Sequence, residues 1–239
     1  MPETTNENLF TFDVKSILGV EFSTPQHSKL MQNLYHAQPK MTTNTKYLLF
    51  QHNTTGFKLG VSAFLLKQLK DNDFYVSTIN QNGQREFEFD FHNLALFQIS
   101  LESFFTYCGA VITSTCREIW SAYALNLRTD SVYFFNVKDA LKQNHPNAQI
   151  THHFVDVNDK EWFKYLYGAR NRVEHGQILM FEFRGDTGRV VIADKQNVDN
   201  DSITTDKRYE PAVWCQTIFD ETCGFVDICF KDLNTRLYG

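Results

Sequence analysis

The residues best suited to chemistry lie together in one short stretch of the chain, Arg170-Asn171-Arg172-Val173-Glu174-His175. A histidine side chain transfers protons near neutral pH, and an arginine holds a phosphate oxygen through a two-pronged contact. Asn171, one helical turn before His175, can orient the imidazole or bind a substrate oxygen. These groups are the components of metal-free phosphodiester chemistry on RNA, in which the ribose 2′-hydroxyl is the nucleophile.

A helix is expected to hold this stretch. Asn158 and Asp159 are good N-cap residues, Glu161 would lie in the first turn, and Gly176 stands where a C-cap glycine belongs. We therefore predict a helix that begins at Asn158 or Asp159 and ends at His175. In its last turn the helix dipole would favour the imidazolium form of His175.

The candidate residues fall outside the core face of this helix. At about 100° per residue, the core face consists of Trp162, Tyr165, Leu166, Ala169 and Val173. Arg170 and His175 are both expected to point away from it, with Tyr167 and Glu174 between them. A face that combines Arg, Asn and His with aromatic rings suits a cleft or an oligomer interface. We take Arg170, Asn171 and His175 as catalytic candidates, and Tyr167 and Glu174 as substrate contacts.

Three further helices are expected around it, over residues 93–126, 132–143 and 211–236, because apolar residues recur there at helical spacing. The first of them carries Glu102 inside an otherwise apolar pattern, where it is a candidate second acid of the cleft or a salt-bridged surface residue. Four helices with short connections predict a mainly α fold built on a four-helix bundle.

The remaining segments are expected to decorate this bundle. Residues 1–45 are rich in Thr, Asn and Gln and predict irregular structure, and residues 47–91 are mixed. Alternating patterns predict one hairpin from residues 75–79 and 87–91 and another from 178–183 and 189–192. We therefore expect an N-terminal α/β extension over residues 1–91 and a helical bundle over residues 92–239.

The pattern Arg170-Asn171-x-x-x-His175, late in the third helix of a predicted bundle, resembles the motif of HEPN-domain proteins (higher eukaryotes and prokaryotes nucleotide-binding). Many HEPN proteins are metal-independent endoribonucleases of toxin, defence or RNA-processing systems. They commonly act as dimers whose motifs face each other across a shared cleft. The resemblance implies that Arg170 and His175 are the catalytic pair, that Asn171 supports them, and that the protein is a homodimer acting on RNA.

One position departs from a subgroup of that family. HEPN toxins that pair with a nucleotidyltransferase antitoxin often carry a tyrosine two residues after the histidine, and Gln177 stands there in this chain. The departure counts against that toxin–antitoxin subtype, while another antitoxin or regulatory partner stays open.

Composition restricts the partners and the compartment. The formal net charge is −5, so a nucleic acid would have to be held by a local basic patch. The five cysteines form no C-x-x-C pair, which predicts core thiols, no metal site and a reducing cytoplasm. We identify no secretion signal, no membrane span and no cofactor motif.

Two alternatives compete with the ribonuclease interpretation. Arg170 could simply pair with Glu174 or Glu161 on the surface while His175 caps the helix. The same face could also bind nucleotide, RNA or a protein partner without catalysis, and a dry, packed face would indicate a structural assembly protein. A metal-independent endoribonuclease is the leading hypothesis.

Overall fold

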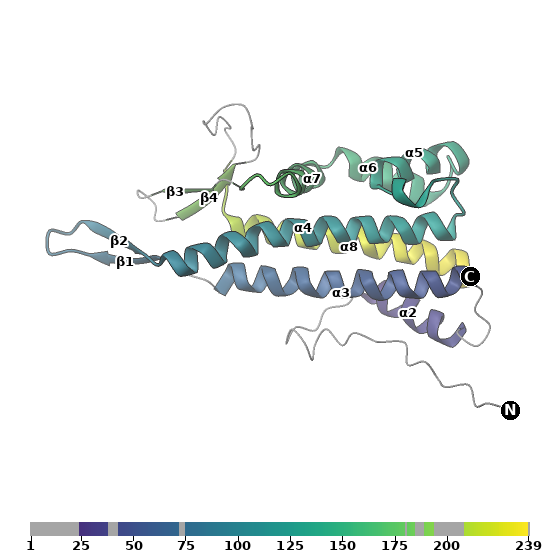
Figure 1. Ribbon diagram of the computed structural model, residues 1–239, viewed down its shortest axis with the longest axis horizontal. Coiled ribbons are helices and arrows are strands. Elements are labelled where there is room, and N and C mark those ends of the chain that lie inside the picture. Colours follow the sequence, from purple (N-terminus) through teal and green to yellow (C-terminus); the bar gives the residue numbers. More distant parts are fainter. Residues whose placement is uncertain are drawn as a thin grey trace.

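The computed structural model describes residues 24–37, 43–71, 75–179, 181–184, 189–193 and 208–238. Most of these residues are helical, which confirms the expected mainly α class. The long helices α3 (Thr43–Asp71), α4 (Phe91–Ala122) and α8 (Pro211–Tyr238) run alongside one another (Figure 1). Three shorter helices lie on one side of α4, namely α5 (Phe134–Asn144), α6 (Gln149–Asp159) and α7 (Glu161–Glu174).

Helix α4 (Phe91–Ala122) lies at the centre of the molecule and packs against α3, α5, α7 and α8. It begins where the Asp90 carboxylate accepts hydrogen bonds from the backbone N–H groups of His92 and Asn93, at 2.9 and 3.1 Å. It ends before Ala124, whose backbone takes a positive φ of 48°. Among the described residues α4 is the one helix long and apolar enough to cross a membrane by length and composition, and 50% of its most apolar window is buried inside the bundle.

The N-terminal part of the chain differs from the expectation of irregular structure. Helix α2 (Pro25–Ala37) packs against α8, and α3 (Thr43–Asp71) lies along α4 (Figure 1). Local sequence hides α3, because Asn53-Thr54-Thr55-Gly56 in its middle is poor in helix propensity. Packing of its buried leucines on α4 outweighs that deficit, and these are Leu48, Leu49, Leu59, Leu66 and Leu69.

The hydrophobic core runs across the expected boundary between residues 91 and 92. Buried leucines of α2 and α3 belong to the same core cluster as the phenylalanines of α4 and of α8 (Pro211–Tyr238). The described residues before α4 therefore supply part of the bundle itself as well as a hairpin.

The sequence predicts one helix from Asn158 or Asp159 to His175, but the structure divides this region between two helices. Helix α6 (Gln149–Asp159) ends at the residues expected to open the third helix, and α7 (Glu161–Glu174) begins after Lys160. Lys160 has an extended backbone, with φ −69° and ψ 140°, which separates the two. Apolar residues at helical spacing bury one face of α6, namely Ile150, Phe154 and Val157. Helix α5 (Phe134–Asn144) matches its expected range closely.

Both expected hairpins are present with shifted ends, since Phe91 begins α4 and residues 178 and 179 precede the strand. Strand β1 (Tyr75–Ile79) pairs antiparallel with β2 (Arg85–Phe89), and the pair projects beyond the end of the bundle (Figure 1). Strands β3 (Phe181–Arg184) and β4 (Arg189–Ala193) form the second hairpin, to which β5 (Arg208–Tyr209) adds a third strand. The turn expected at residues 185–188 lies outside the described residues.

Candidate functional site

The helical wheel predicts that Arg170 points outward, but in the structure its side chain lies against α4. Its side chain keeps 15% of its exposure, because α4 presents Gly109 where the arginine stem crosses. A Cβ atom at position 109 would come within 2.3 Å of Arg170 Cδ. Since α7 runs across α4 instead of along it (Figure 1), a residue on the flank of α7 reaches the surface of α4. The wheel misplaced Arg170 because it contains no information about a crossing helix.

Three neighbours fix the Arg170 guanidinium. Its Nε and Nη2 atoms contact Glu174 Oε1 at 2.8 and 2.7 Å, and Nη1 donates to Thr113 Oγ1 at 3.5 Å. The guanidinium carbon also lies 6.0 Å from the centre of the Tyr167 ring. The ion pair to Glu174 is therefore present, as the structural alternative predicts. This ion pair uses two of the five N–H donors of the arginine, and a third donates only a long hydrogen bond to Thr113, so donors are left for a ligand.

Two further cations, Lys58 and Arg117, lie near the same stretch of α4. Lys58 of α3 donates through Nζ to Ser114 Oγ at 2.6 Å and to the Ala110 carbonyl at 3.5 Å. Burial lowers the pKa of Lys58 from its ordinary value, and the nearby charges of Arg117 and Arg170 lower it further. We refer to Lys58, Arg117 and Arg170 as the basic cluster. The sequence signals only Arg170, since Lys58 and Arg117 belong to no motif.

The end of α7 exposes the other two catalytic candidates. Asn171 and His175 are both exposed, and His175 is the C-cap residue of the helix. Gly176 follows with a φ of 73°, and its N–H donates to the Val173 carbonyl at 3.0 Å. The Gln177 N–H donates to the Arg172 carbonyl at 2.9 Å, which completes a Schellman motif. The expected glycine cap is confirmed.

Arg170 and His175 of one chain do not face each other. Five residues at about 100° each place them about 140° apart around α7. Glu174, between them, is already paired with Arg170. The structure therefore brings together Arg170, Glu174 and Tyr167, and it leaves Asn171 and His175 on a separate exposed flank.

Glu102 and Tyr167 are engaged in packing. The Glu102 carboxylate accepts a hydrogen bond from the Leu179 N–H at 3.1 Å and contacts the Gln98 amide, so it anchors the chain after α7. The Tyr167 ring packs against Phe163 at 4.7 Å between centroids, and burial raises the pKa of its hydroxyl. The structure offers Glu102 no contact with the basic cluster among the described residues.

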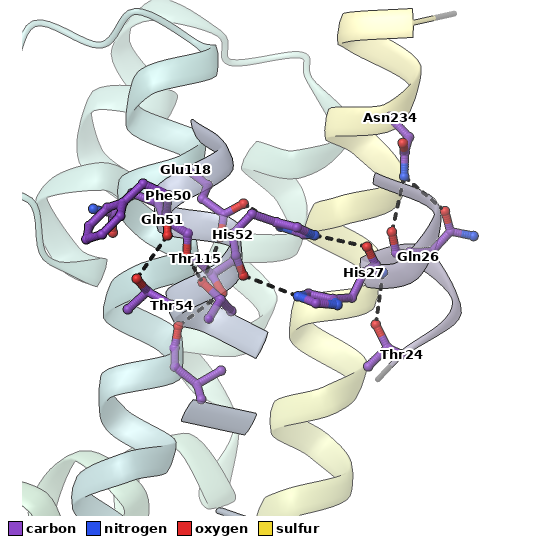
Figure 2. A network of polar contacts seen from close by, with 12 residues as sticks. Thr24, Gln26, His27, Phe50, Gln51, His52, Thr54, Thr115, Glu118 and Asn234 are labelled. Atoms are coloured by element: carbon purple, nitrogen blue, oxygen red, sulfur yellow. Dashed lines mark hydrogen bonds and ion pairs between the residues drawn. The ribbon is translucent and has the colours of Figure 1, made fainter. Parts of the chain in front are cut away.

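A second polar site lies buried between α2, α3 and α4 (Figure 2). His52 Nε2 donates to the His27 carbonyl at 2.9 Å, and His27 Nε2 donates to the His52 carbonyl at 3.3 Å. The two rings stack at 4.1 Å. Glu118, fully buried, accepts from His52 Nδ1 at 2.8 Å and from Thr55 Oγ1 at 2.7 Å. Sequence reasoning assigned no partner to either histidine, because Glu118 is 66 residues from His52.

Among the described residues no group of three or more His, Cys, Asp or Glu side chains could hold a metal ion. Four of the cysteines are buried and Cys223 is partly buried, as expected of core thiols. Burial raises the pKa of Cys108 to about 12, which suppresses its thiolate.

Comparison of the chain with protein-family models, with curated proteins and with solved structures gives no match. The function is therefore inferred from the chemistry of the two candidate sites. The buried histidines are closed off by packing, whereas the surroundings of Arg170 combine cations with exposed polar groups.

Proposed function

We propose that this protein is a metal-independent endoribonuclease that cleaves RNA at Arg170, Asn171 and His175. The observation that carries the proposal is the basic cluster beside α4, whose Arg170 belongs to the same helix, α7, that exposes Asn171 and His175 at its end. The protein has a formal net charge of −5, so a local gathering of cations is the feature expected of a phosphate-binding surface.

In the proposed reaction the ribose 2′-oxygen attacks the adjacent phosphorus. The 2′-hydroxyl gives up its proton as the new P–O2′ bond forms, and the P–O5′ bond breaks with its electron pair passing to the 5′-oxygen. The 5′-oxygen takes up a proton, so the products are a 2′,3′-cyclic phosphate and a 5′-hydroxyl. His175 acts in proton transfer, and Asn171 orients its ring or binds a substrate oxygen.

Arg170 stabilises the negative charge that develops on the phosphate oxygens. Its guanidinium is held in one place by Glu174 and by packing over Gly109, so little side-chain freedom is lost when a phosphate binds. The long hydrogen bond from Nη1 to Thr113, at 3.5 Å, is the one that a phosphate oxygen would replace.

A second copy of the chain completes the site in this proposal. Arg170 and His175 lie on different flanks of one α7, so one copy alone does not place both on the same phosphate. Two copies related by a twofold axis bring the His175 of one toward the Arg170 of the other. RNA is then cleaved in a cleft shared by two α7 helices.

The test is incubation of purified protein with end-labelled single-stranded and structured RNA in EDTA. We expect wild-type protein to produce cyclic-phosphate ends. Arg170→Gln and His175→Ala should each lower the cleavage rate by about 10²-fold or more, as expected for loss of charge stabilisation or proton transfer. Folding of each variant is checked by circular dichroism and thermal unfolding.

Matched variants separate the site from general loss of charge. His152→Ala removes an exposed histidine of α6, and Arg128→Gln removes an exposed arginine of a surface ion pair. Both should cleave like wild type. Failure of the wild type to cleave across the RNA panel, or equal cleavage by His175→Ala, would overturn the nuclease proposal.

The second candidate is a bundle that binds RNA or nucleotide without cutting it. The Arg170–Glu174 ion pair favours it, since a paired arginine is a complete structural unit without a substrate. Binding that depends on Arg170, with no cleavage by the wild type, would establish this alternative.

A further inference from the structure

We infer that Lys58 and Arg117 form a second phosphate-binding site beside Arg170, which takes a neighbouring phosphate of the same RNA strand. The inference rests on the proposed function for the identity of the strand, while the site itself rests on the geometry of α3, α4 and α7. Neither residue belongs to the Arg170–His175 motif.

Lys58 and Arg170 approach α4 from different helices and end on consecutive residues. Lys58 Nζ binds Ser114 Oγ at 2.6 Å, and Arg170 Nη1 binds Thr113 Oγ1 at 3.5 Å. Although α3 and α7 lie on different sides of α4 (Figure 1), both side chains reach the same turn of it, and the charge of Arg170 lowers the pKa of Lys58. The Thr113 hydroxyl already donates to the Gly109 carbonyl at 3.1 Å, so of the two hydroxyls it is that of Ser114 that can donate to an anion.

Arg117 extends the cluster by one turn of α4. It lies three and four residues after Ser114 and Thr113, on the same side of the helix. Its Nε is buried and has no hydrogen-bond partner among the described residues. A buried donor without a partner is unfavourable, and an anion that accepted a hydrogen bond from it would remove that penalty.

Two carboxylates near the cluster already have partners other than Lys58 and Arg117. Glu174 pairs with Arg170, and Glu118, the residue after Arg117, is directed at His52 and Thr55 in the core (Figure 2). Within the described part of the chain, Lys58 and Arg117 form no ion pair with a carboxylate. Lys58 and Arg117 are thus like charges held close together without a counter-charge of their own, which is unfavourable and suits a ligand that supplies negative charge.

A nucleic-acid strand fits this arrangement better than a single phosphate does. The three cations spread over two turns of α4, from Ala110 to Arg117, and a strand presents its phosphates in such a row. A free polyphosphate has the same chemistry, so the experiment includes one.

The experiment measures binding of a fluorescent 2′-O-methyl RNA oligonucleotide to the full chain by anisotropy at several salt concentrations. The methyl group blocks the 2′-oxygen, so binding is measured without cleavage. For single strands, each phosphate neutralised contributes about 0.7 to the slope of log affinity against log salt concentration. We expect Lys58→Gln and Arg117→Gln each to lower that slope by about 0.7 and to weaken binding. Lys58→Arg should keep the slope.

Lys67→Gln is the matched control, because Lys67 is an exposed lysine of the same helix. It should bind as wild type does. Thermal unfolding checks each variant, and Lys58→Met, which keeps the packing of the aliphatic stem, replaces Lys58→Gln if that variant is unstable.

The outcomes distinguish the second site from the nuclease proposal. A lower salt-dependence slope in the Lys58 and Arg117 variants, with no cleavage of ordinary RNA by wild type, supports the phosphate site and contradicts the nuclease proposal. Cleavage with an unchanged slope in the Lys58 and Arg117 variants overturns the phosphate site alone. If inorganic tripolyphosphate binds through Lys58 and Arg117 but the oligonucleotide does not, the strand assignment is wrong.

Discussion

Arg170 reaches the surface of α4 because position 109 carries no side chain. The arginine stem occupies the space where a Cβ would be, 2.3 Å from its Cδ atom. Glu174 and Thr113 then fix the direction of the guanidinium. A single glycine on one helix thus determines where a charge from another helix is placed.

Gly109→Ala is therefore expected to displace Arg170. The added methyl group overpacks the contact and should lower the free energy of unfolding by about 1–3 kcal/mol. RNA binding should weaken by about tenfold, equivalent to about 1.4 kcal/mol, because the guanidinium leaves its place beside the basic cluster. Urea unfolding and the anisotropy assay measure the two effects.

Gly168→Ala supplies the comparison on α7. A Cβ at Gly168 would meet nothing within 4 Å, and the position is exposed. This substitution should raise the free energy of unfolding by about 0.5–1 kcal/mol, because alanine has a higher helix propensity than glycine. If Gly109→Ala were as well tolerated as Gly168→Ala, the conclusion that Arg170 packs over Gly109 would be wrong.

A pair of buried histidines joins helix α2 to its neighbours in the bundle. His27 of α2 and His52 of α3 each donate a ring N–H to the other's backbone carbonyl, and Phe230 of α8 packs against both rings. Because a carbonyl only accepts hydrogen bonds, both Nε2 atoms carry hydrogen. The histidines thus connect the consecutive helices α2 and α3 to α8, which is distant from both in sequence.

This contact makes the stability of the protein depend on pH. Burial, with a smaller effect of nearby His52, lowers the pKa of His27 from 6.5 to about 3. Between these values the unfolded chain takes up a proton that the folded chain does not, so stability falls as the pH decreases from 6.5 toward 3. At pH 5 this contribution should be about 2 kcal/mol smaller than at pH 7.5.

Urea unfolding of wild type and His27→Leu at pH 7.5 and pH 5 measures that difference. The variant lacks the titrating group, so its stability should fall by about 2 kcal/mol less than that of wild type over this range. His36→Gln changes an exposed histidine of the same helix and should behave as wild type does. Equal losses for wild type and His27→Leu would show that His27 does not remain neutral in the folded protein.

At the scale of the whole molecule, the proposed reaction needs two copies of the chain. Arg170 and His175 lie about 140° apart around α7, so the proposal combines an arginine from one copy with a histidine from its partner. This arrangement predicts that two inactive variants restore each other.

Mixing Arg170→Gln with His175→Ala, after subunit exchange, should recover about a quarter of wild-type cleavage. Half of the dimers are then mixed, and each mixed dimer has one intact site of two. Light scattering on the purified protein establishes the dimer before the assay. Cleavage no higher than that of either variant alone would show that Arg170 and His175 act within one copy.

Local sequence was sufficient for the features that depend on near neighbours. The glycine that ends α7, the hairpin of β1 and β2 and the ranges of α4, α5 and α8 follow from capping, turn residues and helical periodicity. The Arg170-Asn171-x-x-x-His175 stretch was likewise visible, because its residues lie within about two turns of one helix.

Tertiary structure alone decided the features that depend on distant parts of the chain. Packing on α4 makes α3 a helix despite its weak propensity, and the crossing of α7 over Gly109 buries Arg170. Lys58 and Arg117 join Arg170 because α3 and α7 both pack on one turn of α4. Periodicity within a segment reports which face is apolar, but contacts between segments decide what that face meets, and those contacts lie outside any local pattern.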